Sequence, residues 1–213
     1  HSHERLTALV FAADGAAAVI APATDVGVLR AGASLGSTSL STWRDGEDPY
    51  RLVAQHLGTP GPAQVGGGLA AEHVFRLRDA VGEVGPVSEE VLECFMAKDP
   101  AEIAELARAA AAIDRVHAKV PELLVPGATE AAVAAELEKL ILAEHRSVDF
   151  VIVGSGENGA NPHHSFSDRV LTAGDPVVVD LGGTLDSGYH SDCTRTHVVG
   201  GADAAAGDFR ECY

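Results

Sequence analysis

The sequence predicts a two-domain protein of the mixed α/β (α+β) class. Short apolar, β-branched runs at residues 6–11, 17–20 and 177–179 are bounded by turn residues and indicate strands. Apolar residues that recur at helical spacing over residues 103–120 and 130–145 indicate two amphipathic helices. With 213 residues and 46% hydrophobic content, the chain can bury the core of one large or two smaller domains.

A first, mixed α/β domain is expected over residues 1–97. Asp14-Gly15 stands between the first two apolar runs and predicts a hairpin that joins them. Helices are expected over residues 49–57, 70–80 and 89–96. Proline at the start of the first of these helices suits a position where the backbone donor is not needed.

The second domain, expected over residues 98–213, opens with a strong helix-start signal. Asp99 is a capping residue, Pro100 suits the first helical position, and Glu102 lies three residues after the cap. Thr129 is expected to cap the next amphipathic helix.

Two acidic residues on neighbouring predicted strands are the candidates for chemistry. Asp180 ends a run of three valines, where burial is expected, and Asp192 lies on a second strand predicted over residues 189–199. Facing side chains on antiparallel strands lie about 5 Å apart, so a divalent cation between two such carboxylates would relieve their repulsion. A structural alternative stays open, in which Asp192 pairs with Arg195 on a solvated face.

The segment that carries these acids resembles a known family signature. Asp180-Leu-Gly-Gly followed by Gly188-Tyr-His-Ser-Asp192-Cys-Thr-Arg-Thr196 is similar to the motif of the pita-bread metallopeptidases, which include methionine aminopeptidase, prolidase and aminopeptidase P. The Ser-Asp-x-Thr-Arg-Thr form resembles the proline-specific branch. The resemblance implies a creatinase-like amino-terminal domain followed by the first half of a pita-bread catalytic domain.

The same resemblance implies an activity and its cofactors. Asp180 and Asp192 would bind two divalent metal ions (Mn, Co or Zn), and the reaction would be hydrolysis of the peptide bond before proline, as in Xaa-Pro dipeptidase or aminopeptidase. The expected partners are a proline-containing peptide substrate and a second copy of the chain in a homodimer. Thr194 and Arg195 are expected to support the two carboxylates.

A second match supplies the catalytic candidate. Residues 156–164, Gly-Glu-Asn-Gly-Ala-Asn-Pro-His-His, resemble the family segment that ends in Pro-His, whose histidine contacts substrate and assists proton transfer. That role falls to His163. Adjacent side chains in an extended chain point in different directions, so at most one of the two histidines faces the site, and His164 is the weaker candidate.

The remaining metal ligands of the family, one histidine and two glutamates, come from segments beyond Tyr213. We expect that the sequence is part of a longer chain; the alternatives are a second polypeptide that supplies the ligands and an inactive relative. Two rival functions stay open. One is a metal-free enzyme such as creatinase, and the other is a non-enzymatic binding module.

Composition excludes several classes of partner. The formal charge of −16 opposes binding to nucleic acid or to an anionic membrane surface. No apolar run approaches the roughly 20 residues that span a bilayer, so we expect a cytoplasmic protein. The three cysteines, an odd number without a paired spacing, predict no disulfide framework. His117 and His145, on the predicted helices, are expected to be surface or cap residues.

Overall fold

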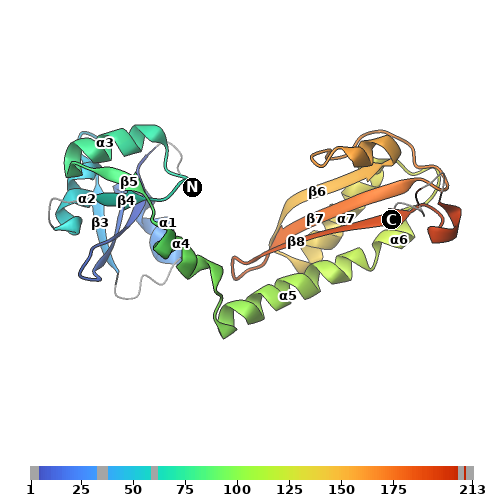
Figure 1. Ribbon diagram of the computed structural model, residues 1–213, viewed down its shortest axis with the longest axis horizontal. Coiled ribbons are helices and arrows are strands. Elements are labelled where there is room, and N and C mark those ends of the chain that lie inside the picture. Colours follow the sequence, from blue (N-terminus) through green and yellow to red (C-terminus); the bar gives the residue numbers. More distant parts are fainter. Residues whose placement is uncertain (1–4, 33–37, 59–61, 206–208, 210–213) are drawn as a thin grey trace. The chain divides into compact units, whose positions relative to one another are not determined.

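The computed structural model describes residues 5–32, 38–58, 62–205 and 209 (Figure 1). The chain divides into two compact units, His1–Ala97 and Lys98–Tyr213. The interpretation of these units as incomplete domains of a longer chain stays a prediction.

The first unit combines two small sheets with helices. In one sheet β1 runs antiparallel to β2 and β3 runs parallel to β2, while the other sheet pairs β4 and β5 in parallel. The elements in chain order are β1 (Ala8–Phe11), β2 (Ala17–Pro22), the 3-10 helix η1 (Ala23–Asp25), α1 (Val26–Gly32), β3 (Ser39–Trp43), α2 (Pro49–Leu57), β4 (Ala63–Val65), α3 (Ala71–Val81), β5 (Val84–Pro86) and α4 (Glu89–Met96).

Local signals in the first unit are confirmed by the structure. Gly15 adopts a φ of 87° in the turn between β1 and β2, a conformation that glycine accepts without strain. Asp48 caps α2, whose first residue is Pro49, by accepting hydrogen bonds from the first turn. Trp43 is buried and its indole N–H donates to the carbonyl of Leu6 at 3.1 Å, which joins β3 to the start of the chain.

The second unit is a layer of helices on one face of an antiparallel sheet. The sheet has the order β6-β7-β8, and in Figure 1 its strands lie over α7, with α5 along β8. The elements are α5 (Pro100–His117), α6 (Val120–Leu123), α7 (Glu130–Glu144), β6 (Ser147–Ser155), the 3-10 helix η2 (Gly156–Ala160), β7 (Pro176–Thr184), β8 (His190–Val198) and the 3-10 helix η3 (Ala202–Ala204).

The core of the second unit lies between the sheet and its helices. Val177, Val179 and Leu181 on β7 are fully buried against an apolar layer that includes Leu137 and Ile141 of α7. Strand side chains alternate between two faces. The residues between these three, including Asp180, therefore point to the opposite face, which we call the outer face of the sheet.

Strand β7 is longer than the sequence indicated. The sequence indicated a strand at residues 177–179 bounded by turn residues, but the strand continues through Gly182 and Gly183 to Thr184. A Cβ atom at Gly182 would lie 2.3 Å from the Phe150 ring. One at Gly183 would lie 2.8 Å from the His145 ring. The glycines thus allow close approach of side chains inside the sheet.

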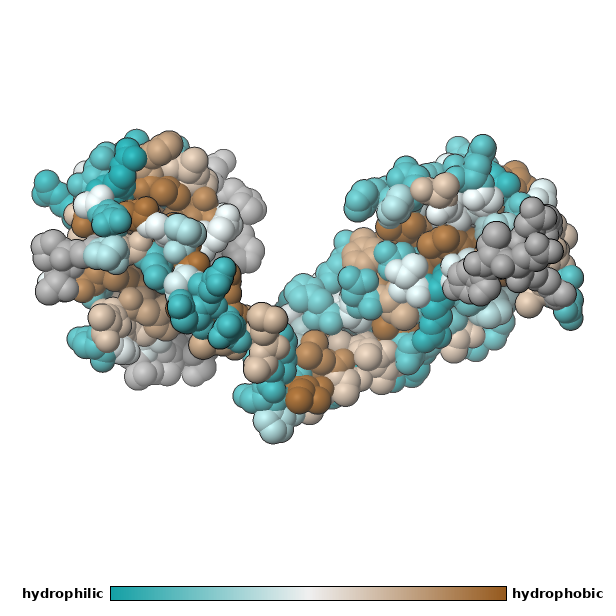
Figure 2. Space-filling model, viewed as in Figure 1, coloured by the Kyte–Doolittle hydropathy of each residue, from teal (hydrophilic) through white to brown (hydrophobic). Residues whose placement is uncertain are grey.

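Helix α5 begins as predicted, with reciprocal capping bonds between Asp99 and Glu102 at 2.8 Å. Its first turns extend past the sheet in Figure 1, and Ile103 and Leu106 there are 55% and 39% exposed. Figure 2 accordingly shows hydrophobic surface over this part of α5. This apolar strip lies outside the core of the unit.

Candidate metal centre and histidine loop

The two predicted metal ligands lie on the same face of the sheet. Asp180 on β7 pairs with Thr194 of β8, and Asp192 pairs with Gly182, so the two acids are diagonal neighbours. Diagonal positions on one face are separated by roughly 7 Å, farther apart than the directly facing pair that the sequence suggested. Both acids nevertheless project from the outer face, with Asp192 exposed and Asp180 half-buried.

Among the residues that the structure describes, no arginine forms an ion pair with either carboxylate. Arg195 points to the helix side of the sheet, where its guanidinium lies 2.5 Å from Asp114 of α5. The alternative in which Arg195 pairs with Asp192 is therefore wrong, because alternation places the two side chains on opposite faces. The expectation that Arg195 supports the two acids fails for the same reason. Thr194 does support one of them, since its hydroxyl donates to Asp180 at 2.7 Å.

The donor chemistry of the pair suits a hard or borderline divalent cation, because carboxylate oxygens are the ligands that such ions prefer. Within the described ranges, no group of three or more His, Cys, Asp or Glu side chains could hold a metal ion. The two acids thus fit one part of a metal site. Cys193, which follows Asp192 on β8, packs against the buried layer and so faces away from the outer face.

A polar cluster borders Asp192 on the outer face. His190, two residues earlier on β8, has an exposed imidazole whose Nδ1 lies 2.8 Å from Asp149, and Thr184 donates to the same carboxylate at 2.6 Å. Asp149 stands at the irregularity where the β6–β7 register shifts. Burial raises the pKa of Asp149, but the hydrogen bonds from His190 and Thr184 outweigh it and lower that pKa.

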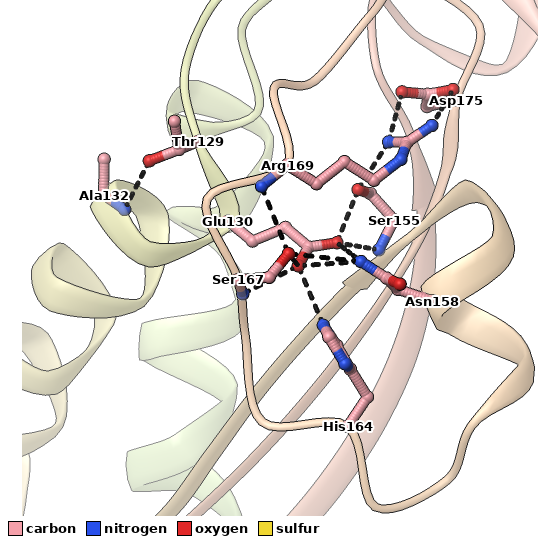
Figure 3. Close-up of polar contacts among 9 residues, drawn as sticks. All are labelled: Thr129, Glu130, Ala132, Ser155, Asn158, His164, Ser167, Arg169 and Asp175. Atoms are coloured by element: carbon pink, nitrogen blue, oxygen red, sulfur yellow. Dashed lines mark hydrogen bonds and ion pairs between the residues drawn. The ribbon is translucent and has the colours of Figure 1, made fainter.

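A second cluster, which the sequence did not indicate, centres on Glu130 at the first turn of α7 (Figure 3). Its side chain is fully buried. Thr129, not Glu130, caps the helix, since its hydroxyl accepts from the Ala132 N–H at 3.1 Å. The Glu130 carboxylate instead receives hydrogen bonds from the segment that follows β6, from Ser155 N–H (2.7 Å) and hydroxyl (2.6 Å), Asn158 (3.0 Å), His164 (2.8 Å), and Ser167 N–H (2.9 Å) and hydroxyl (2.7 Å).

These contacts keep Glu130 ionised. Burial by itself raises the pKa of this carboxyl, but hydrogen bonds from Ser155, His164 and Asn158 outweigh burial and bring the pKa to about 2. An ionised, fully buried carboxylate is tolerated only where its lone pairs are occupied. The segment that supplies the donors is therefore fixed to the start of α7.

The same segment carries both histidine candidates, and the structure separates them. His164 is turned inward, with its Nε2 2.8 Å from Glu130 and 18% of its side chain exposed. His163 is exposed, and its backbone N–H donates to Asn161 at 3.1 Å. The expectation that two adjacent histidines point in different directions is confirmed. The catalytic role of His163 stays a prediction.

An arginine extends the cluster toward the sheet. Arg169 donates to the Ser155 hydroxyl at 2.6 Å and pairs with Asp175 at 2.8 Å. The pKa of Asp175 is lowered to about 2, chiefly by this hydrogen bond from Arg169. Gly156 has a φ of 53°, and a Cβ there would lie 2.6 Å from the Arg169 guanidinium. These contacts hold together the two ends of the segment that follows β6.

Two helical histidines are buried. His117 is neither a surface nor a cap residue, contrary to the expectation, whereas His145 is a cap residue, one of the two expected alternatives. His117 is 1% exposed and its Nε2 lies 2.8 Å from the Cys193 carbonyl; burial lowers its pKa. His145 is the C-cap residue of α7 but is only 6% exposed, and its Nε2 lies 2.9 Å from the Ser191 hydroxyl. Both rings join helices to β8 on the side of the sheet away from the candidate metal ligands.

The mixed α/β fold carries two carboxylates on one face of its sheet, and comparison with known proteins gives the family. The model of metallopeptidase family M24 matches residues 104–213, more than half of the chain. The chain belongs to metallopeptidase family M24. The resemblance seen in the sequence motifs is thus confirmed, and so is the mixed α/β fold with relatives of the pita-bread type.

Individual relatives are similar over different lengths. "Probable dipeptidase PepE" of Mycobacterium bovis is 51% identical over 94% of this chain and 55% of its own length. The crystal structure of dipeptidase PepE from Mycobacterium ulcerans is 47% identical with a TM-score of 0.87, over 99% of this chain and 57% of that one. "Xaa-Pro dipeptidase" of Pyrococcus furiosus is 34% identical over 59% of this chain and 36% of its own length.

The chain spans about half the length of the mycobacterial curated relatives that it matches. In the parts of the chain that are described, no helix is both long and apolar enough to cross a membrane. Cys94 and Cys193 are free thiols, and Cys212 lies outside the described residues.

Proposed function

We propose that the full-length protein that carries this chain hydrolyses the peptide bond before proline in short peptides, using two divalent metal ions. Membership of family M24 supports a metallopeptidase, and the relatives named PepE support a dipeptidase. The preference for proline has weaker support, from the Ser-Asp-x-Thr-Arg-Thr form of the motif and from the relative named Xaa-Pro dipeptidase. The proposal also allows an Xaa-Pro aminopeptidase, which differs from the dipeptidase in that it accepts longer peptides.

One observation carries the proposal. Asp180 and Asp192 project from the same face of a sheet, and in the described part of the chain Arg195, the arginine nearest to them in sequence, pairs with Asp114 instead. When bound there, divalent ions supply Lewis-acid catalysis, the chemistry that polarises a carbonyl and activates water. Thr194, by donating to Asp180, fixes the direction of that carboxylate.

The role proposed for His163 is to bind substrate and to move a proton at its imidazole. Its exposed ring fits this role, because a group that exchanges protons with substrate must be accessible. His164 does not fit it, since its Nε2 is already used by Glu130. The homodimer and the cytoplasmic location are further parts of the proposal.

Two other functions compete with this one. A metal-free, creatinase-like enzyme would not need the two acids, and a binding module would be free to lose them. Both acids are present and both project from the outer face. This favours the metallopeptidase over either rival.

The test uses the full-length protein with Ala-Pro, Ala-Pro-Ala and the control Ala-Ala, each with Mn²⁺, Co²⁺ or Zn²⁺ and with a chelator. We expect metal-dependent cleavage of at least one proline substrate, much slower cleavage of Ala-Ala, and loss of activity in Asp192→Asn. Asp186→Asn is the matched control, because Asp186 is an exposed acid in the turn between β7 and β8. It should retain activity.

Each alternative predicts its own result. Failure to cleave any of the three peptides with metal supplied would favour the binding module. Cleavage that survives both the chelator and Asp192→Asn would favour a metal-free enzyme. Rapid cleavage of Ala-Ala would leave a metallopeptidase without the preference for proline.

A further inference from the structure

The loop after β6, residues 155–169, is attached to the start of α7 in two ways. The backbone N–H groups of Glu130 and Ala131 donate to the carbonyls of Arg169 (3.1 Å) and Ser167 (3.0 Å), and the Glu130 side chain accepts bonds from along the loop. Six donor groups reach the Glu130 carboxylate, two from Ser155, one from Asn158, one from His164 and two from Ser167. They come from the start, the middle and the end of the loop, and none comes from α7 itself. Figure 3 shows them converging on the carboxylate from several sides.

This arrangement differs from an ordinary acid at a helix start. An acid in the first turn interacts with the helix dipole and is usually solvated. Glu130 is fully buried, and the capping of α7 is already provided by Thr129. The ionised carboxylate therefore acts on the loop, and its burial is compensated only while the loop is closed around it.

The loop also runs beside the candidate metal centre. Val153 of β6 donates to the Ser165 carbonyl at 2.7 Å, so the loop follows the edge of β6 that is not paired with β7. Within η2, a Cβ at Gly159 would lie 3.3 Å from Val178, which shares the outer face with Asp180 two residues later. The beginning of the loop thus lies on the face that carries the two acids.

We propose that Glu130 is a positioning residue for His163, which it orients by holding the neighbouring His164 inward. This inference rests on the function proposed above, in which His163 contacts substrate. The tether at His164 fixes the direction of the adjacent residue, because the backbone between them forms a turn in which Asn161 accepts both the His163 N–H (3.1 Å) and the His164 N–H (3.0 Å). A side chain that must meet substrate benefits from a backbone held in this way.

The first test follows the loop directly and does not require activity. In the full-length protein, His164→Ala removes the tether but leaves Glu130 with its other donors, whereas His164→Gln keeps an N–H donor near the position of Nε2. We expect amide hydrogen exchange of residues 161–168 to be about tenfold faster in His164→Ala, as for loss of one hydrogen bond to a charged group. His164→Gln should restore slow exchange.

The second test separates positioning from a general loss of structure. His164→Ala should lower kcat/KM for the proline substrate by about tenfold, with His164→Gln near wild type. In a His163→Gln background, His164→Ala should have no further effect on kcat/KM, because the tether acts only through His163. Glu130→Gln should behave like His164→Ala or worse, and Glu136→Gln, an exposed acid on the same helix, is the control.

The outcomes distinguish this inference from the proposed function. Unchanged loop exchange in His164→Ala, or losses of activity that multiply in the double variant, would overturn the positioning role. If the wild-type protein cleaves no peptide, the proposed function fails, and the exchange experiment still decides whether His164 and Glu130 hold the loop. If Glu130→Gln does not fold, the two His164 variants carry the test.

Discussion

Protonation of Glu130 is predicted to destabilise the second unit. The pKa of this carboxyl is about 2 in the folded protein against an ordinary value of 4.5. That difference corresponds to about 3 kcal/mol between the ionised and protonated forms. Because folding lowers the pKa, the stabilisation is fully present above pH 4.5 and is lost as the pH falls from 4.5 toward 2.

The substitution Glu130→Gln makes this contribution measurable. The amide keeps the size of the side chain but places N–H groups against donors and removes the charge, so the free energy of unfolding at pH 7 should fall by about 3 kcal/mol. The difference in the free energy of unfolding between the wild type and the variant should become small as the pH approaches 2, because the Glu130 carboxyl then becomes protonated and, like the amide, neutral. Urea titrations with pulsed hydrogen exchange, read in β6–β8, follow the second unit separately from the first.

An exposed acid on the same helix provides the control. Glu136 pairs with Lys139 at 2.7 Å on the surface of α7, with 53% of its side chain exposed. Glu136→Gln should change the free energy of unfolding by no more than about 0.5 kcal/mol at any pH. The reasoning about Glu130 is refuted if its variant shows no loss at pH 7, or if the loss is the same at pH 7 and near pH 2.

Three further results are expected. In the full-length protein, Asp192→Asn should weaken Mn²⁺ binding in calorimetry by at least about tenfold, since one carboxylate donor is lost. Gly183→Ala should destabilise by about 2 kcal/mol in thermal unfolding, because the new methyl would lie 2.8 Å from the His145 ring, whereas Gly85→Ala, with nothing within 4 Å, should be nearly neutral. Asp175→Asn should lose more stability at pH 7 than near pH 2, since the pKa of Asp175 is lowered to about 2 by Arg169.

Features set by short stretches of sequence were predictable. The capping residues Asp99 and Thr129 start α5 and α7 as expected, because a cap and its partners lie within three residues of each other. The valine run of β7 and its placement in the core followed from composition and length. The end of β7 was not predictable, because Gly182 and Gly183 are explained by Phe150 and His145, which lie more than thirty residues away.

The candidate site likewise has one part that the sequence predicted and one part that it did not. The paired acids were predicted from a motif, and the structure adds that they are diagonal neighbours and that Arg195 is on the other face. Glu130 gave no signal, since an acid after a threonine cap is common in a solvated first turn. Its partners stand 25 to 37 residues later in the chain, and only the closing of the loop brings them together.

The position of the acids also bears on how metal binding relates to folding. Two carboxylates roughly 7 Å apart on a solvated face repel each other by only about 0.6 kcal/mol in water. The buried layer beneath them, with Val179 and Leu181 fully buried, contributes several times that amount. The sheet therefore does not need a cation to form. It presents Asp180 and Asp192 at fixed positions, and under the proposed function the affinity for a metal would depend on the further ligands that join them.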